Sequence, residues 1–151
     1  MQIWMRVERI LERGGDPFPK GYRLHYYPEV AVITNIDFRD EKPENGIKSF
    51  FVELLYNNSE THETSDWDAV AHFDHNPSNP SGHNVLDEGL HMDILRLGEK
   101  VDKKTEGEGY FSPPSRLSRY PRYCETHFDE NWESLVTDYE KDLGVRRFRE
   151  Q

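Results

Sequence analysis

Residues 67–94 read WDAVAHFDHNPSNPSGHNVLDEGLHMDI, and this stretch decides the predicted fold. It contains two runs that alternate between apolar and polar residues, which is the pattern of a half-buried strand. The segment between them, Asn76 to Gly82, has two Asn-Pro steps and a closing glycine, which are typical of turns. The stretch therefore predicts an antiparallel strand pair joined by a long loop.

The alternation also predicts which side chains meet. Successive side chains of a strand point to opposite faces, so each run has an apolar and a polar face. The apolar residues are Trp67, Ala69, Ala71 and Phe73 in the first run, then Leu90, Met92 and Ile94 in the second. If both apolar rows pack on the core, the polar row lies on one open face, which holds His72, Asp74, His91 and Asp93. We expect four more polar residues at the loop end of the pair, namely His75, His83, Asp87 and Glu88. A β-bulge would change this arrangement.

The rest of the chain supplies three more predicted strands and a helix. Residues 22–27, 30–38 and 47–56 are rich in β-branched and aromatic residues. Residues 1–13 fit either a helix or a strand, and residues 98–109 have the composition of a solvated loop. From Arg122, apolar residues recur at spacings of three and four, and Gly144 stands as a helix stop. The prediction is a single α+β domain over residues 1–151, with a mostly antiparallel sheet of about five strands packed against a long C-terminal helix.

Composition excludes several classes of protein. The net charge of −10 argues against broad nonspecific binding to nucleic acids. The one cysteine, Cys124, excludes an intramolecular disulfide framework and cysteine-rich zinc sites. No stretch is apolar enough to span a membrane, and the first residues lack the apolar region of a signal peptide. We therefore expect a cytoplasmic protein with no membrane association.

The His/Asp cluster of residues 72–93 has three interpretations. It can be a solvated sheet face that carries ordinary hydrogen-bonded pairs. It can bind a divalent transition metal, because imidazole and carboxylate are natural ligands of such ions. No familiar spacing such as His-Glu-x-x-His occurs, so neither a tightly bound metal nor a cofactor is expected. It can also cleave a phosphodiester, with one histidine removing the ribose 2′-hydroxyl proton, another protonating the leaving oxygen and an arginine balancing phosphate charge.

The acid–base interpretation assigns a role to each candidate. The proton-transfer residues are His75, His83 and His91, and the carboxylates that orient them are Asp74 and Glu88. Arg96 contacts phosphate, and a second phosphate-binding region is the basic cluster Arg116, Arg119 and Arg122 at the start of the helix. Charge balance on an acidic protein is the simpler explanation of that cluster.

Three motifs carry a family resemblance. Phe73-Asp-His75, Gly82-His83 and Asp87-Glu-Gly-Leu-His-Met-Asp93, followed by Gly98-Glu-Lys100, resemble a family of small haloarchaeal proteins. That family has Tyr-Asp-His, Gly-His-Asp and Glu-Gly-Leu-His-x-Asp in the same order, and this chain departs from it with Asn84 after His83. More distantly, the strand-Asp-loop-His-strand arrangement resembles the TumE-like toxins of type II toxin–antitoxin systems.

The distant resemblance implies a function by analogy. It implies a TumE-like toxin or a related component, here a metal-independent ribonuclease with RNA and a small antitoxin protein as partners. A homo-oligomer fits the same interpretation. The competing class is a noncatalytic interaction or metal-binding protein whose His/Asp-rich loop is structural.

Overall fold

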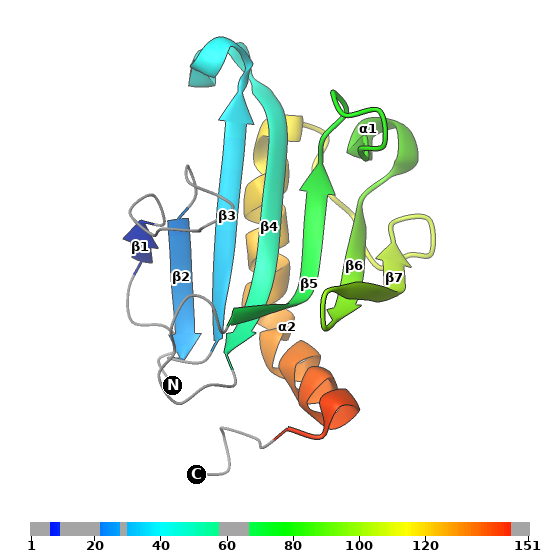
Figure 1. Cartoon of the computed structure of the whole chain (residues 1–151). Coiled ribbons are helices and arrows are strands. Elements are labelled where there is room, and N and C mark those ends of the chain that lie inside the picture. Colours follow the sequence, from blue (N-terminus) through cyan, green and yellow to red (C-terminus); the bar gives the residue numbers. More distant parts are fainter. Residues whose placement is uncertain (1–6, 10–21, 28–29, 58–66, 146–151) are drawn as a thin grey trace.

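The computed structural model describes residues 7–9, 22–27, 30–57 and 67–145, and it has an α+β fold (Figure 1). Seven strands form one sheet in sequence order, and each is antiparallel to its neighbours. They are β1 (Val7–Arg9), β2 (Tyr22–Tyr27), β3 (Val30–Phe38), β4 (Ile47–Asn57), β5 (Trp67–His75), β6 (His91–Arg96) and β7 (Glu99–Thr105). Helix α1 (Val85–Glu88) connects β5 to β6, and helix α2 (Tyr120–Leu143) lies along one face of the sheet. Short 3-10 turns occupy residues 39–41, 43–45 and 117–119.

The predicted fold class is confirmed, and the sheet is larger than expected. The five predicted strands correspond to β2 through β6. The described part of the N-terminal segment, Val7–Arg9, is a strand, and the rest of residues 1–13 lies outside the described residues.

The prediction of a solvated loop at residues 98–109 is wrong for its first half, because Glu99–Thr105 forms strand β7. Leu97 and Gly98 have φ angles of 53° and 82°, which suits a tight two-residue hairpin between β6 and β7. Most side chains of β7 are exposed on this edge strand, so no apolar alternation marked it in the sequence.

Helix α2 covers the face of the sheet that carries the main core. Pro121 occupies the first turn, where a missing N–H is tolerated, and Gly144 ends the helix in the left-handed conformation. Its buried stripe includes Cys124, Phe128, Trp132, Val136 and Tyr139, as the predicted spacing requires. No helix within the described residues combines the length and the apolar composition needed to cross a membrane.

A bulge in β5 changes the predicted faces of that strand. Leu54 pairs with Ala71 but Leu55 pairs with Ala69, so Val70 is an extra residue. Val70 and Ala71 therefore both pack into the core beneath α2. Trp67 and Ala69 instead pack with Ile33 and Leu55 in a separate small cluster. The prediction that Trp67 and Ala69 share a face with Ala71 and Phe73 is wrong, because the bulge reverses the alternation.

Among the polar contacts between the sheet and α2 in the described residues are four in which a hydroxyl donates to a carboxylate. The pairs are Tyr26 to Asp129, Thr34 to Glu125, Tyr56 to Glu140, and Tyr139 to Asp68. The Thr34–Glu125 contact measures 2.5 Å and the Tyr56–Glu140 contact 2.9 Å. Each hydroxyl thus supplies the hydrogen bond that a carboxylate at this largely buried interface needs.

Candidate functional site

The loop between β5 and β6 forms one wall of the candidate site. It is closed by a 2.7 Å hydrogen bond from the Asn76 N–H to the His83 carbonyl. Gly82 sits inside this closure, and its N–H donates to the Asn79 carbonyl at 2.7 Å. Asn84 then caps α1, since its side chain accepts from the Leu86 N–H. These contacts hold the main chain of the loop and so determine the position of His83 at its end.

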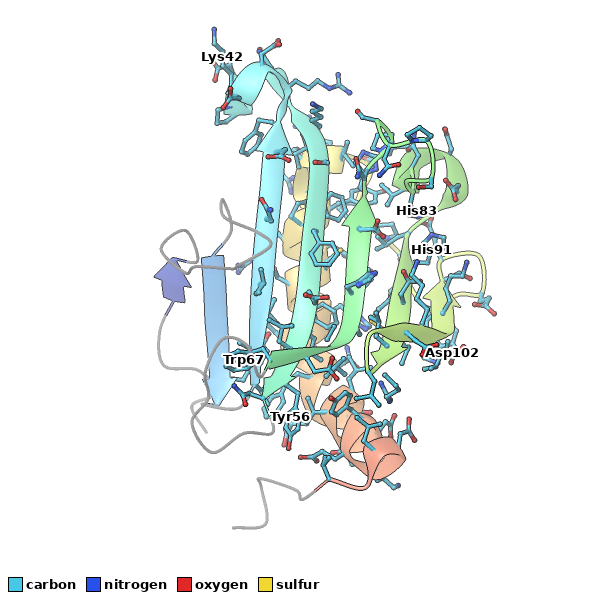
Figure 2. All side chains as sticks on the ribbon, in the orientation of Figure 1. Lys42, Tyr56, Trp67, His83, His91 and Asp102 are labelled. Atoms are coloured by element: carbon cyan, nitrogen blue, oxygen red, sulfur yellow. The ribbon has the colours of Figure 1, made fainter. Side chains whose placement is uncertain are left out.

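Three side chains converge at this wall on the sheet face opposite α2. The Nδ1 atom of His83 lies 2.7 Å from Nε2 of His91 and 3.0 Å from Oε1 of Glu88. Figure 2 shows His83 and His91 close together near the start of β6. We call His83, Glu88 and His91 the His–Glu–His trio.

Each member of the trio is held by contacts outside it. The second ring nitrogen of His83, Nε2, lies 2.9 Å from the Gly89 carbonyl, which can only accept a hydrogen bond. A proton on Nε2 satisfies this carbonyl, while Nδ1 contacts His91 and the Glu88 carboxylate, which likewise can only accept. The Asn84 N–H donates to Oε2 of Glu88 at 3.1 Å, and His91 begins strand β6. Backbone groups and the start of β6 therefore position the three side chains of the trio.

Burial favours a neutral imidazole at His91, and hydrogen bonds favour an ionised carboxylate at Glu88. Burial lowers the pKa of His91, and the charges of His83 and Lys103 lower it further. The Asn84 backbone N–H and the His83 side chain lower the pKa of Glu88. Only 10% of the His83 side chain is exposed, against 52% of the Glu88 side chain, so the trio opens to solvent on the Glu88 side.

A second cluster on the same face has a different character. Nε2 of His72 lies 3.0 Å from Asp93, its Nδ1 lies 3.6 Å from Glu53, and the Lys100 ammonium lies 3.2 Å from Asp93. Burial opposes the charge on His72, but the two carboxylates outweigh burial and raise the pKa of His72 to about 9. The same contacts, with Lys100, lower the pKa of Asp93 to about 2 against the effect of burial. This cluster is a closed salt-bridge network whose histidine is protonated.

The structure places Asp74 with that network. Donor atoms of His72, Asp74 and Asp93 lie within 4.8 Å of one another. The predicted open face of His72, Asp74, Asp93 and His91 therefore exists, but it divides into two groups. His91 pairs with His83, while Asp74 belongs to the His72 group.

His75 lies apart from the other proton-transfer candidates. It is 2% exposed, its ring stacks on Phe50 with centroids 5.6 Å apart, and its Nδ1 accepts from the Val85 N–H at 3.2 Å. Burial lowers the pKa of His75, and nearby His83 and Arg39 lower it further. A neutral His75 in the core thus anchors the start of α1.

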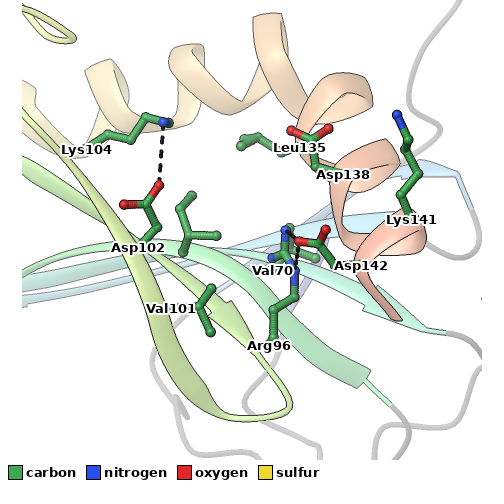
Figure 3. A pocket seen from close by; sticks show the side chains of 10 residues that line it. Val70, Arg96, Val101, Asp102, Lys104, Leu135, Asp138, Lys141 and Asp142 are labelled. Atoms are coloured by element: carbon green, nitrogen blue, oxygen red, sulfur yellow. Dashed lines mark hydrogen bonds and ion pairs between the residues drawn. The ribbon is translucent and has the colours of Figure 1, made fainter. Parts of the chain in front are cut away.

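The candidate phosphate-binding arginines lie away from the trio. Arg96 faces a groove between β7 and α2, where it forms an ion pair with Asp142 at 2.9 Å (Figure 3). Its guanidinium group also lies over the Tyr139 ring. It ends β6, which His91 begins, so about 16 Å of strand and the sheet itself separate the two side chains. Arg116 and Arg119 are exposed near the start of α2, and Arg122 contacts Glu125. The structure does not join any of them to the trio.

The trio and the salt-bridge network can do different chemistry. Metal binding needs imidazole nitrogens with a free lone pair. In the His72 network those lone pairs carry protons, and Lys100 adds a second positive charge. In the trio, Nδ1 of His83 and Nε2 of His91 lie 2.7 Å apart beside a carboxylate, and the two rings overlap with centroids 3.5 Å apart and planes at 33°. Of these two groups, the trio is therefore the better set of ligands for a cation.

A protein-family model matches most of the chain. Residues 24–145 match the family described as "Domain of unknown function (DUF7718)", which spans β2 through α2. The chain belongs to the DUF7718 family. Neither the curated proteins nor the solved structures include a match to it.

Sequence analysis missed several residues that build the site in this DUF7718 chain. Gly82 and Gly89 act through the backbone, and no side-chain pattern marks such a role. Asn84 does carry a signal, because a helix-capping residue followed one turn later by a carboxylate, here the Glu88 that the sequence had already indicated, resembles a capping box. Glu53 and Lys100 come from strands β4 and β7, so only the sheet register brings them to His72.

Proposed function

We propose that this protein is a hydrolase that binds one divalent transition-metal ion through His83, Glu88 and His91. The observation that carries the proposal is the convergence of three donor atoms, with Nδ1 of His83 at 2.7 Å from His91 and 3.0 Å from Glu88. Ligands that share a zinc ion at about 2.0–2.1 Å lie roughly 2.9–3.4 Å from one another. A separation increase of a few tenths of an ångström, with rotation of the two imidazole rings, whose centroids lie 3.5 Å apart, would admit the ion.

The contacts around the trio support a metal site. A histidine that binds a metal usually donates its other ring N–H to a carbonyl or a carboxylate. His83 has this partner in the Gly89 carbonyl, and Glu88 has a comparable one in the Asn84 N–H. The sequence analysis expected no tightly bound metal because no compact ligand spacing is present along the chain. The folded chain supplies the compact set through the loop, α1 and β6.

The openness of the trio favours catalysis over a structural role. Structural zinc sites are closed by four protein ligands, whereas catalytic sites use three and leave one position for water. The trio has three candidate ligands, and half of the Glu88 side chain faces solvent. A divalent ion in such a site acidifies a water molecule toward neutral pH, so hydrolysis is the reaction class that fits.

A second candidate function is the metal-independent ribonuclease of a TumE-like toxin. The contact that favours it is the same 2.7 Å approach of His83 and His91, because it brings two candidate proton-transfer groups together and Glu88 contacts one of them. In this proposal RNA is the substrate and a small antitoxin protein is the partner, as the resemblance implies. The lone cysteine supports the cytoplasmic location that belongs to either proposal.

Metal content distinguishes the two candidates. Untagged protein should contain about one zinc or similar ion per chain by elemental analysis, and chelation should lower its melting temperature. His83→Gln and Glu88→Gln should lose the ion. Asp87→Asn is the matched control, since it removes a neighbouring exposed carboxylate of α1 that belongs to neither cluster.

Two results would reject the metal proposal. One is stoichiometric metal that survives in the His83 and Glu88 variants. The other is metal-free protein that cleaves RNA in the presence of a chelator and loses roughly 10²–10⁴-fold of that activity on replacement of His83 or His91. The latter result would establish the ribonuclease.

A further inference from the structure

Strand β7 brings a lysine to the open face beside the trio. In the register of β6 and β7, Lys103 lies opposite Asp93, and Thr105 lies opposite His91. Residues directly opposite in adjacent strands share a face, so Lys103 projects from the face that carries Asp93 and His91. Its charge acts on His91. The ammonium group thus lies on the metal-binding side of the sheet.

Lys103 differs from the other two lysines of the same strand. Lys100 is paired with Asp93, and Lys104 is paired with Asp102 and lies over the Tyr110 ring. Lys104 also lines the groove on the α2 side, away from the trio (Figure 3). Within the part of the chain that the structure describes, no ion pair involves Lys103. It is the lysine of β7 whose charge is left for a ligand.

The charges on this face favour an anion once the trio holds a metal ion. His72 and Lys100 balance the two carboxylates of Glu53 and Asp93. Glu88 offsets only one of the two charges of a divalent ion. The remaining positive charge of the ion and that of Lys103 share this region with the carboxylates of Asp74 and, in α1, Asp87. The ion and Lys103 therefore provide two positive charges for an anion on a protein whose overall charge is −10.

We propose that the substrate of this site is a phosphate ester, with one phosphoryl oxygen at the ion and another accepting a hydrogen bond from Lys103. This inference rests on the proposed metal site. A phosphoryl group has several charged oxygens and can bridge two separate positive charges, and lysine is a common phosphate ligand. Lys103 acts as a substrate-binding residue and takes no part in holding the metal.

The test uses the full chain loaded with cobalt(II), whose visible spectrum reports its ligands. Inorganic phosphate should change the spectrum saturably, whereas acetate should bind much more weakly. Lys103→Ala should weaken phosphate binding about tenfold, the loss of one charge-assisted hydrogen bond. Lys103→Arg should restore most of it. Lys104→Ala is the matched control on the opposite side of the strand and should bind phosphate like the wild-type protein.

The outcomes separate this inference from the metal proposal. All four proteins should bind cobalt with the same affinity, because neither lysine is a ligand. A cobalt spectrum that phosphate leaves unchanged, or that acetate and phosphate change equally, would overturn the phosphate-ester assignment and leave the metal site intact. Equal phosphate affinities of the Lys103→Ala and Lys104→Ala variants would overturn the role of Lys103. A protein that gives no cobalt spectrum would overturn both proposals.

Discussion

Replacement of Gly82 by alanine tests whether the loop holds the trio in place. An added Cβ at Gly82 would lie 1.9 Å from the Asn76 carbonyl oxygen and 3.1 Å from Cβ of Asn79. Contacts of real Cβ atoms are essentially never shorter than 3.0 Å, so the loop must move by at least 1.1 Å at this point. The obstacle is backbone, which cannot turn away as the tip of a flexible side chain can.

Movement of the loop at Gly82 would also displace His83. The Asn76 N–H holds the His83 carbonyl at 2.7 Å, and Gly82 precedes His83 in the chain. Metal sites tolerate ligand displacements of about 0.2 Å, so a movement several times larger should weaken binding about 10–100-fold. Overpacking at this site should also lower the free energy of unfolding by about 1–3 kcal/mol.

Two measurements on each variant separate these effects. Cobalt titration gives the metal affinity, and urea unfolding of the metal-free protein gives stability. Gly107→Ala is the matched control, since its added Cβ would meet only Thr105 Oγ1, at 4.0 Å, and should change neither quantity. A Gly82→Ala protein with wild-type metal affinity and stability would refute the reasoning that the Asn76–His83 closure positions the trio.

Two further predictions concern the rest of the fold. His72→Gln should destabilise the protein by roughly 3 kcal/mol at pH 6, because a rise in the pKa of His72 from 6.5 to about 9 stabilises the folded state by about 1.4 kcal/mol per pH unit. This contribution is fully present below pH 6.5 and is lost as the pH rises through 9, so urea unfolding should show the difference shrinking over that range; a difference independent of pH would contradict the assignment. Trp132→Ala should cost roughly 3–5 kcal/mol in urea unfolding, because Trp132 is 4% exposed and stacks on Tyr26 at 5.3 Å, whereas Glu133→Ala on the exposed side of the same helix should cost little.

Local patterns in the sequence predict most of the fold. Apolar alternation identifies β2 through β6, and helical spacing with Gly144 identifies α2, because each of these elements buries one face. Strand β7 carries no such signal, since its side chains are mostly exposed and its pairing partner supplies the stability. The β5 bulge at Val70 is equally invisible, because it depends on the register with β4.

The candidate site was only partly predictable for a related reason. Alternation correctly directed His91 and His72 to the face away from the core. Alternation could not show that the side chain of His83, from the loop, contacts His91. It also could not show that His75 is buried in the core and accepts a hydrogen bond from the Val85 N–H. Those contacts depend on a backbone closure and on a buried pocket, which sequence spacing does not encode.

The hydroxyl–carboxylate contacts between the sheet and α2 constrain how this chain can evolve. If α2 slid by one turn, Glu125 and Glu140 would move about 5.4 Å away from Thr34 and Tyr56, and each buried carboxylate would lose that hydrogen bond. Apolar contacts alone tolerate such a slip far better, since one aliphatic side chain can replace another. The polar pairs therefore specify a single docking position, and substitutions at these sites must occur in both partners together. Apolar replacement of a complete pair should preserve stability but permit alternative helix positions.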